Sequence, residues 1–396
     1  MPLPSSLQVV LLEDWQHGGF GLYVHWPFCQ SKCPYCDFNS HVTRNVDQQL
    51  WADAYCREIE RIGLLSGTKP LKSIYFGGGT PSLMHPDTVA KILQKAKETW
   101  AASNDIEITL EANPTSVEAG RFSGYRDAGV NRVSIGVQAL NDIDLRKLGR
   151  RHSVEEAKKA VELAGKTFER ISFDLIYARQ DQSLQEWRVE LGEALTMSSS
   201  HLSLYQLTIE QGTAFADRLS AGGLHGLPHE DLSADMYELT QELTEKAGFS
   251  AYEVSNHAKS SAESRHNLIY WNAGDYAGVG PGAHGRITVN NSRIATEAIS
   301  DPGNWLTAVN NKGSGDLMPI TQSNNERADE YLMMGLRLSE GISLQRYKSI
   351  LGASLNHHKI NHLVDIGMIE VNNIQLSVTT AGRPVLNAII RELLTE

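Results

Sequence analysis

The feature that most constrains the fold is an alternation of strand-like and helical segments between residues 22 and 207. Short apolar runs with strand periodicity trade places with longer stretches of helical periodicity. Strands are expected at 22–25, 72–76, 107–111, 132–137, 171–177 and 201–207, and helices at 47–65, 86–100, 115–128, 141–148, 153–166 and 184–198. Such an alternation predicts a parallel α/β sheet covered by helices. Eight units close a full barrel, so six predict an open, partial (β/α)6 TIM-like barrel with its sites at the C-terminal strand ends.

The chain is long enough for this core and a smaller second domain. We expect an N-terminal lead-in at 1–20, the (β/α)6 core at 21–250, a connector at 251–320 and a smaller, mostly helical C-terminal domain at 321–396.

Composition narrows the class of partner and the compartment. The formal net charge of −11 argues against nucleic acid and anionic membranes. No apolar run reaches the roughly 20 residues of a membrane span, and the N-terminus does not resemble a signal peptide. Four cysteines, three of them in one short segment, are not a disulfide framework, so a reducing cytoplasm is expected. Cys56 lies in a helical pattern and is expected to be a packing residue.

The three clustered cysteines form a C-x3-C-x2-C array at Cys29, Cys33 and Cys36, directly after the first predicted strand. On a helix this spacing would place all three on one face, as a stripe of small core residues. Pro27 and Pro34 argue against a helix, because a proline inside a helix removes a hydrogen bond and clashes with the preceding turn. Three thiols gathered in a loop predict a metal site.

The spacing alone leaves the metal open between an iron–sulfur cluster and zinc, with plain core thiols as a further alternative. A closed zinc site needs a fourth ligand, for which His25 is the nearest candidate. A cubane cluster usually takes four cysteines, so three would leave one iron open to an outside ligand. Trp26, Phe28, Tyr35 and Phe38 surround the array and would shield a cluster from water.

Polar and glycine residues stand at the ends of the following strands. The second strand ends in three glycines at 77–79, which predict either close approach of backbone amides to a ligand or a tight turn. Glu111, Gln138 and Asp174 follow at later strand ends, and Arg150 could pair with an anion or be a solvated charge. An aspartate inside a strand needs a partner, so a buried, hydrogen-bonded role is expected for Asp174.

The cysteine array resembles the cluster loop of the radical S-adenosylmethionine (SAM) superfamily. That resemblance implies a [4Fe–4S] cluster on Cys29, Cys33 and Cys36, whose open iron is chelated by the amino and carboxylate groups of SAM. Reductive cleavage of SAM on such a cluster yields a 5′-deoxyadenosyl radical. The flanking segments at 23–29 and 33–38 resemble the group around oxygen-independent coproporphyrinogen III oxidase, and within it the heme-chaperone branch.

The same resemblance implies which residues contact SAM. By position they are Tyr23, Tyr35, Gly78, Gly79, Thr80, Glu111, Gln138, Arg150 and Asp174, with His284 placed near SAM by an approximate match. The chain departs from its relatives at 178–182, where they usually carry a Pro-Gly-type turn. The shape of that loop is therefore open.

A further segment, H-N-x-x-Y-W, distinguishes the heme-chaperone branch. Taken alone, its histidine would be an ordinary surface or core residue. The resemblance makes His266, Asn267, Tyr270 and Trp271 heme-site candidates, because histidine can ligate heme iron and aromatic rings flank a porphyrin. The axial ligand stays open, with His257 as a rival.

These features predict a heme chaperone that binds heme, carries a SAM-chelated [4Fe–4S] cluster and transfers heme to an acceptor protein. The alternative is a radical SAM decarboxylase of coproporphyrinogen III. Where the oxidase continues Gly-Cys, this chain has Asp37 and Phe38, and the oxidase has a longer N-terminal arm than the 22 residues before Tyr23. Decarboxylase activity is therefore not expected. SAM cleavage, the identity of the acceptor and a homodimer are left open.

Overall fold

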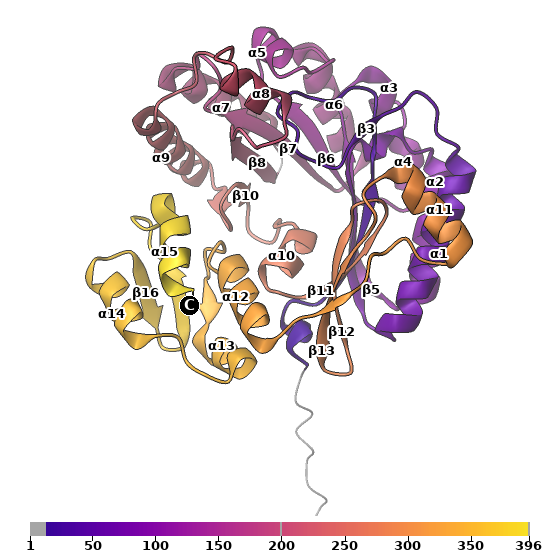
Figure 1. Ribbon diagram of the computed structural model, residues 1–396. Coiled ribbons are helices and arrows are strands. Elements are labelled where there is room, and N and C mark those ends of the chain that lie inside the picture. The colour runs from indigo at the N-terminus through magenta and orange to yellow at the C-terminus, as the bar shows by residue number, and fades with distance from the viewer. Residues whose placement is uncertain (1–12, 199, 395–396) are drawn as a thin grey trace, which may run out of the picture.

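The computed structural model describes residues 13–198 and 200–394. Its centre is a parallel sheet in which each predicted strand pairs with the next one along the chain (Figure 1). The strands are β1 (Phe20–Trp26), β4 (Leu71–Gly78), β5 (Ala102–Ala112), β6 (Arg132–Gln138), β7 (Arg170–Tyr177) and β8 (His201–Gln206). The sheet curves into an open barrel, so the predicted fold class is confirmed.

Helices cover the outer face of this sheet (Figure 1). They are α1 (Gln48–Ser66), α2 (Pro86–Thr99), α3 (Ser116–Ala119), α4 (Phe122–Ala128), α5 (Asp142–Lys147), α6 (Val154–Thr167) and α7 (Leu184–Met197). Capping boxes begin α6 at Ser153 and α7 at Ser183, and each pairs the serine with a glutamate three residues on. The helix expected over 115–128 is divided, because α3 ends at Gly120 and α4 begins after Arg121.

Strand β1 shows how the sequence separates the two faces of the sheet. Trp26 packs against Trp51 and Tyr55 of α1, on the outer, apolar side. The alternate positions Tyr23 and His25 point into the barrel. Because side chains alternate across a strand, the apolar residues face the helices and the polar aromatic residues face the interior.

The sheet continues past both ends of the predicted core. Beside β1 lie β11 (Asp275–Val279), parallel to it, and then the antiparallel strands β12 (His284–Val289), β13 (Ser292–Glu297) and β14 (Ile320–Thr321). Beside β8 lie β10 (Asn256–Ala258) and β9 (Ser250–Ala251), both antiparallel. Helix α10 (Arg265–Trp271) contacts the inner side of β4, and α11 (Pro302–Lys312) packs on α1. The segment expected to be a connector therefore contributes strands to the main sheet.

Short elements complete the core around the strand ends. They are the 3-10 turns η1 (Asp14–His17) and η2 (Pro81–Leu83), the small strands β2 (Phe28–Cys29) and β3 (His41–Val42), and the helices α8 (Ala214–Ser220) and α9 (Glu230–Lys246). None of the helices in the described residues is long and apolar enough to cross a bilayer.

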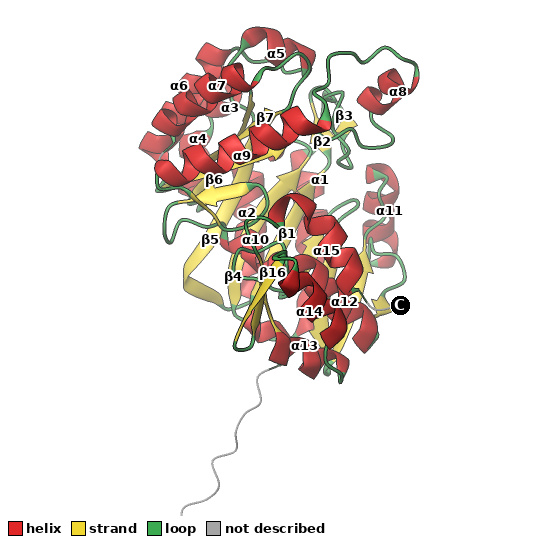
Figure 2. Ribbon diagram, turned by 90° about the vertical axis from the view of Figure 1, so that its left-hand side faces the viewer, coloured by secondary structure: helices red, strands yellow, loops and turns green. Residues whose placement is uncertain are grey.

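The C-terminal domain is mostly helical, as predicted, and has its own hydrophobic core. Its elements are α12 (Asn324–Gly335), β15 (Ile342–Ser343), α13 (Leu344–Leu351), α14 (His357–Asp365), β16 (Ile369–Asn372), β17 (Gln375–Val378), η3 (Arg383–Val385) and α15 (Leu386–Leu393). In Figure 2 this domain lies below α9, on the open side of the barrel. The residue numbers at which the domains divide stay predictions.

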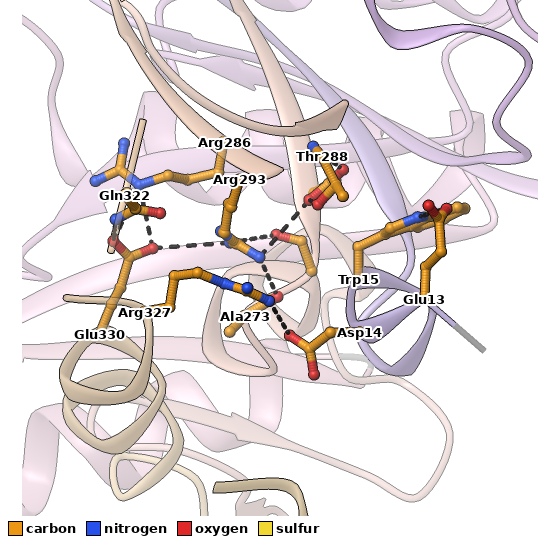
Figure 3. A network of polar contacts seen from close by, with 12 residues as sticks. Glu13, Asp14, Trp15, Ala273, Arg286, Thr288, Arg293, Gln322, Arg327 and Glu330 are labelled. Carbon is orange, nitrogen blue, oxygen red and sulfur yellow. Dashed lines mark hydrogen bonds and ion pairs between the residues drawn. The ribbon is translucent and has the colours of Figure 1, made fainter. Parts of the chain in front are cut away.

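A buried polar network joins this domain to the core (Figure 3). Arg293 of β13 donates to the carbonyl oxygen of Ala273 at 2.7 Å and lies 3.7 Å from Glu330 of α12. Arg327 of α12 lies 3.7 Å from Asp14 in η1. Three segments far apart in the sequence are thus fixed to one another by charges that have little contact with solvent.

Candidate functional site

A cavity of about 420 Å³ opens at the C-terminal ends of the barrel strands. The three cysteines line it, together with eight of the residues predicted to contact SAM: Tyr35, Gly78, Gly79, Thr80, Glu111, Gln138, Arg150 and Asp174. Tyr23 lies deeper in the barrel and His284, which is exposed on β12, does not line the cavity. Residues from five strands and the cysteine loop therefore meet at one place, and their roles in binding stay predictions.

The cysteine loop is not helical, as its prolines predict. Strands β2 and β3 pair at its base, and the amide of Cys36 donates to the carbonyl oxygen of Cys33 at 3.1 Å. The carbonyl oxygen of Pro34 accepts from the amide of Phe215 in α8 at 2.8 Å. The conformation of the loop is thus fixed by strand pairing at its base, by a hydrogen bond within it and by a hydrogen bond from α8.

Two of the thiols accept hydrogen bonds from the barrel. The Thr80 hydroxyl donates to Cys29 Sγ at 3.3 Å, and Arg150 donates to Cys33 Sγ at 3.4 Å. Burial raises the pKa of the Cys29 and Cys36 thiols. Without a metal, Cys29 and Cys36 are thus neutral thiols. The hydrogen bonds from Thr80 and Arg150 would stabilise the thiolates that a metal binds. Hydrogen bonds to sulfur also set the potential of an iron–sulfur cluster.

His25 is not available as a fourth zinc ligand. Its Nε2 donates to the carbonyl oxygen of Asn39 at 2.9 Å, so in the neutral ring Nδ1 accepts from the Tyr23 hydroxyl at 3.0 Å. Burial lowers the pKa of His25 and keeps the ring neutral. Within the described residues, no three His, Cys, Asp or Glu side chains are grouped so as to hold one metal ion.

The glycine run after β4 packs directly under the cysteine loop. A side chain on Gly79 would meet the backbone of Phe28 and Pro27 at 2.9 Å, so only glycine fits there. The amides of Gly79 and Thr80 donate to the carbonyl oxygens of Trp26 and Phe28, at 2.7 and 2.9 Å. The run was expected either to bring backbone amides close to a ligand or to form a tight turn. The amides of Gly79 and Thr80 are therefore engaged within the protein.

Two half-buried carboxyl groups line the cavity. Glu111 accepts from the Tyr75 hydroxyl at 2.7 Å, and Asp174 accepts from the Ser134 hydroxyl at 3.4 Å. Burial raises the pKa of Glu111 to about 7, and the charge of Asp174 contributes. Burial also raises the pKa of Asp174 to about 6. A pair of this kind is suited to a cationic ligand, whose charge would offset the loss of water around the carboxylates.

Arg150 and Gln138 complete the opposite side of the cavity. Arg150 donates to Asn113 Oδ1 at 2.6 Å and to the carbonyl oxygen of Gly136 at 2.8 Å, while its buried Nε has no hydrogen-bond partner. Gln138 has a left-handed backbone, with φ of 73°. Strained backbone of this kind is concentrated at ligand sites.

The loop at 178–182 shows why the chain departs from a Pro-Gly turn. Arg179 is buried and forms ion pairs with Glu190 at 2.6 Å and Asp144 at 3.0 Å. Ala178 and Asp181 take positive φ, at 57° and 61°. The ion pairs of the Arg179 guanidinium, rather than a Pro-Gly turn, therefore fix the conformation of this loop.

The H-N-x-x-Y-W segment forms α10, which lies inside the barrel. Glu107 of β5 accepts from the amides of Arg265 and His266 at 3.2 and 3.1 Å, and so stabilises the first turn of the helix. His266 is buried, with Nδ1 2.7 Å from the Ser73 hydroxyl and Nε2 2.7 Å from the Tyr270 hydroxyl. Both ring nitrogens of His266 are therefore engaged, and burial lowers its pKa to about 3. A heme-binding role for the segment stays a prediction.

Tyr75 connects this segment to the cavity. Its ring stacks on His266 with centroids 5.0 Å apart, and its hydroxyl is the one that donates to Glu111. Neither Tyr75 nor Ser73 was among the predicted site residues. The available signal was the alternation of Ser73 and Tyr75 with Ile74 and Phe76, which places the two polar residues on the opposite face of the strand from the two apolar ones.

Comparison with known proteins places the chain in a family. The Radical SAM superfamily profile matches residues 23–189, and the HemN C-terminal domain profile matches residues 322–385. Heme chaperone HemW of Haemophilus influenzae is 36% identical over 95% of this chain and 98% of its own length. The chain belongs to the HemW family of radical SAM proteins. Radical S-adenosyl methionine domain-containing protein 1, mitochondrial, of Mus musculus is 37% identical over 95% of this chain and 87% of its own length.

One solved structure shares the fold of this HemW-family chain almost throughout. Coproporphyrinogen III oxidase (HemN) from Escherichia coli, described as a radical SAM enzyme, superposes with a TM-score of 0.80 over 95% of this chain and 90% of the oxidase. The two are 19% identical, so the likeness shows a common fold and no more.

Membership of the HemW family and the radical SAM superfamily implies SAM and a [4Fe–4S] cluster, and the cavity fits both. Three thiols stand at its mouth, with hydrogen-bond donors to Cys29 and Cys33 already in place. The half-buried carboxyl groups suit the sulfonium group of SAM, and the unpartnered Nε of Arg150 suits an anion.

Proposed function

We propose that the chain is a heme chaperone: it binds heme, holds a [4Fe–4S] cluster chelated by SAM, and transfers heme to an acceptor protein in the cytoplasm. The observation that carries the proposal is the 36% identity to heme chaperone HemW of Haemophilus influenzae, which extends over 98% of that protein. The resemblance therefore includes both domains and not the radical SAM core alone.

In this proposal Cys29, Cys33 and Cys36 bind three irons of the cluster. Glu111 and Asp174 would balance the sulfonium charge of SAM, and the other proposed SAM contacts follow the cavity lining given above. When bound, the cluster and SAM supply one-electron chemistry. The protein excludes water from the barrel floor and fixes the orientation of both groups.

The cluster and SAM are tested on protein reconstituted anaerobically with iron and sulfide. We expect iron and sulfide in the ratio of a [4Fe–4S] cluster, and an EPR signal of the reduced protein that changes when SAM is added. Each of the variants Cys29→Ala, Cys33→Ala and Cys36→Ala should lose the cluster, whereas Cys56→Ala should keep it. Zinc in anaerobically prepared protein would contradict the proposal.

The chaperone function is tested with hemin and an apoprotein that requires heme. Hemin should bind with a saturable shift of its Soret absorbance, and the loaded chain should activate the acceptor faster than free hemin does. A spectrum identical to that of free hemin under every condition would exclude a chaperone.

A second candidate is the radical SAM decarboxylation of coproporphyrinogen III, favoured by the fold shared with HemN. An anaerobic assay with SAM, a reductant and the porphyrinogen decides between the two. We expect no decarboxylated product from protein with an intact cluster.

A further inference from the structure

A second cavity, of about 720 Å³, lies between the radical SAM core and the C-terminal domain. Its core wall is formed by the end of β8, the loop that follows it, and α9. Its other wall is formed by η3 and α15. We call this cavity the interdomain groove. Its volume lies within the range of about 300–1,000 Å³ that is usual for small-molecule sites.

The walls of the interdomain groove are largely apolar. Leu207 and Ile209 line it from the core, and Val385 and Leu386 line it from the C-terminal domain. Val385 is 46% exposed, and Val254 on the core wall is 36% exposed. Apolar side chains exposed on two facing walls favour a ligand with a broad apolar surface.

Two arginines on the C-terminal wall add positive charge. Arg383 donates to the carbonyl oxygens of Arg337 and Leu338 at 2.8 and 2.6 Å, which fixes its guanidinium in place. The half-buried side chain of Arg337 has no hydrogen bond to any described residue, and neither arginine is part of an ion pair within 13–198 and 200–394. The acidic residue of the lining is Glu230, exposed at the start of α9. The charge of Arg383 is partly offset by the buried Glu253. Arg337, half-buried and without a hydrogen bond or an ion pair in the described residues, is therefore the cation that favours an anionic ligand.

The groove also adjoins the SAM cavity. Gln206, Leu207 and Thr208 line both of them, so a ligand in the groove would lie beside a ligand in the cavity. In contrast, His266 is enclosed in the barrel with both ring nitrogens hydrogen-bonded, and α10 offers no open surface at that residue.

We propose that the interdomain groove is the heme-binding site, with the porphyrin ring between the apolar walls and its propionate carboxylates at Arg337 and Arg383. The inference rests on the proposed chaperone function and assigns a place to its cargo. Heme combines a flat apolar ring with two carboxylates. The apolar side chains of both walls match the ring, and the arginines of the C-terminal wall match the carboxylates.

The charge on the propionates is tested by titrating hemin into the full-length, cluster-loaded protein. Arg337→Ala should weaken hemin binding by about tenfold or more, because a hydrogen bond to a charged group is lost. Arg337→Lys should restore part of the affinity, and Arg391→Ala, which removes an exposed arginine of α15 outside the groove, should bind as the unmodified chain does. Hemin dimethyl ester should bind equally to the unmodified chain and to Arg337→Ala.

The place of the ring is tested by filling the groove from a position that does not contribute to the core. Ala388 is exposed on α15 and lines the groove, so Ala388→Trp should abolish hemin binding and leave the cluster spectrum and the thermal stability unchanged. Arg391→Trp adds the same bulk outside the groove and should have no effect.

The outcomes separate the two proposals. If the unmodified chain binds hemin and both Arg337→Ala and Ala388→Trp bind it equally well, the groove is not the heme site and the chaperone function stands. If the unmodified chain shows no saturable hemin binding, both are overturned.

Discussion

At the scale of single residues, Glu111 and Asp174 determine how the cavity responds to pH. Burial raises the pKa of Glu111 to about 7 and that of Asp174 to about 6, so near neutral pH the cavity without a cation binds protons. A cationic ligand competes for the same carboxylates. Its binding is therefore coupled to the release of protons.

The affinity of the cluster-loaded protein for SAM should rise as pH increases from 5.5 to 7.5. Deprotonation of Glu111 and Asp174 creates the negative charge that would offset the sulfonium group. Calorimetric titrations in buffers of different ionisation enthalpy should show protons released on binding near pH 6.5. Glu111→Gln should bind SAM about 10–100-fold more weakly and lose most of this pH dependence.

The raised pKa of Glu111 also affects the stability of the ligand-free chain, which should decrease as pH rises, whereas the affinity for SAM should increase. The folded protein holds the Glu111 proton up to about pH 7, whereas the unfolded chain releases it near pH 4.5. The free energy of unfolding should therefore fall as pH rises between those values, and Glu111→Gln should reduce that fall to the smaller part that Asp174 contributes. Urea unfolding at pH 5 and pH 8 measures both; an equal decrease in the two proteins would contradict the assignment to Glu111.

The strained backbone at Gln138 should make one substitution there change stability and SAM binding in opposite directions. Replacing Gln138 by glycine removes a side chain at φ of 73°, and should raise the free energy of unfolding by about 1 kcal/mol while weakening SAM binding. Ala178→Gly is the matched control. It removes similar strain at φ of 57° outside the SAM cavity and should stabilise without changing SAM affinity. Urea unfolding and SAM titration of both variants measure the two effects.

At the scale of elements, α10 has a role that its sequence does not reveal. The pattern H-N-x-x-Y-W made its residues heme-site candidates, which they remain. In the fold, His266 and Tyr270 hydrogen-bond to each other inside the barrel, and His266 stacks on Tyr75. The helix therefore supports, through Tyr75, the carboxyl group of Glu111.

His266→Ala should lower the free energy of unfolding by about 1–3 kcal/mol, because the Ser73 and Tyr270 hydroxyls lose a buried partner. It should also weaken SAM binding, since Tyr75 loses the ring against which it packs. Asn267→Ala, one residue along the same helix, should change neither. The measurements are urea unfolding and SAM titration; normal stability of His266→Ala together with a selective loss of heme would instead indicate that His266 is a heme ligand.

The sequence was sufficient to predict the six core strands, because each is a separate apolar run followed by a helix with its own start signal, such as Ser153 or Ser183. It was also sufficient to bring eight proposed SAM contacts into one cavity. It did not predict β11, because Asp275–Val279 is short and contains a buried aspartate and a glycine. That strand is stabilised by pairing with β1 and by an ion pair to Lys69, neither of which a local pattern contains.

At the scale of the whole molecule, Asp275 lies where the core, the added strands and the C-terminal domain meet. It accepts from Lys69 Nζ at 2.5 Å and lies 3.6 Å from Arg293, and Arg293 contacts Glu330 of α12. All of Lys69, Asp275 and Arg293 are buried.

Asp275→Ala should lower the free energy of unfolding by about 3–5 kcal/mol, because it leaves buried positive charges without their partner. Asp53→Ala is the control: its ion pair with Lys91 is solvent-exposed and should contribute less than about 1 kcal/mol. Chemical unfolding of the two variants compares them directly. Similar losses would mean that the buried network does not hold the domains together.

The position of β1 affects how the protein is made. This strand has β4 on one side and β11 on the other, and Phe20 pairs with both Leu71 and Asp275. A nascent chain that has emerged only as far as β8 therefore exposes one whole edge of its first strand, immediately before the cysteine loop. Such edges recruit other chains, and pairings between distant segments form slowly. During synthesis the polypeptide thus depends on its last third to cover the strand that leads into the cysteine loop.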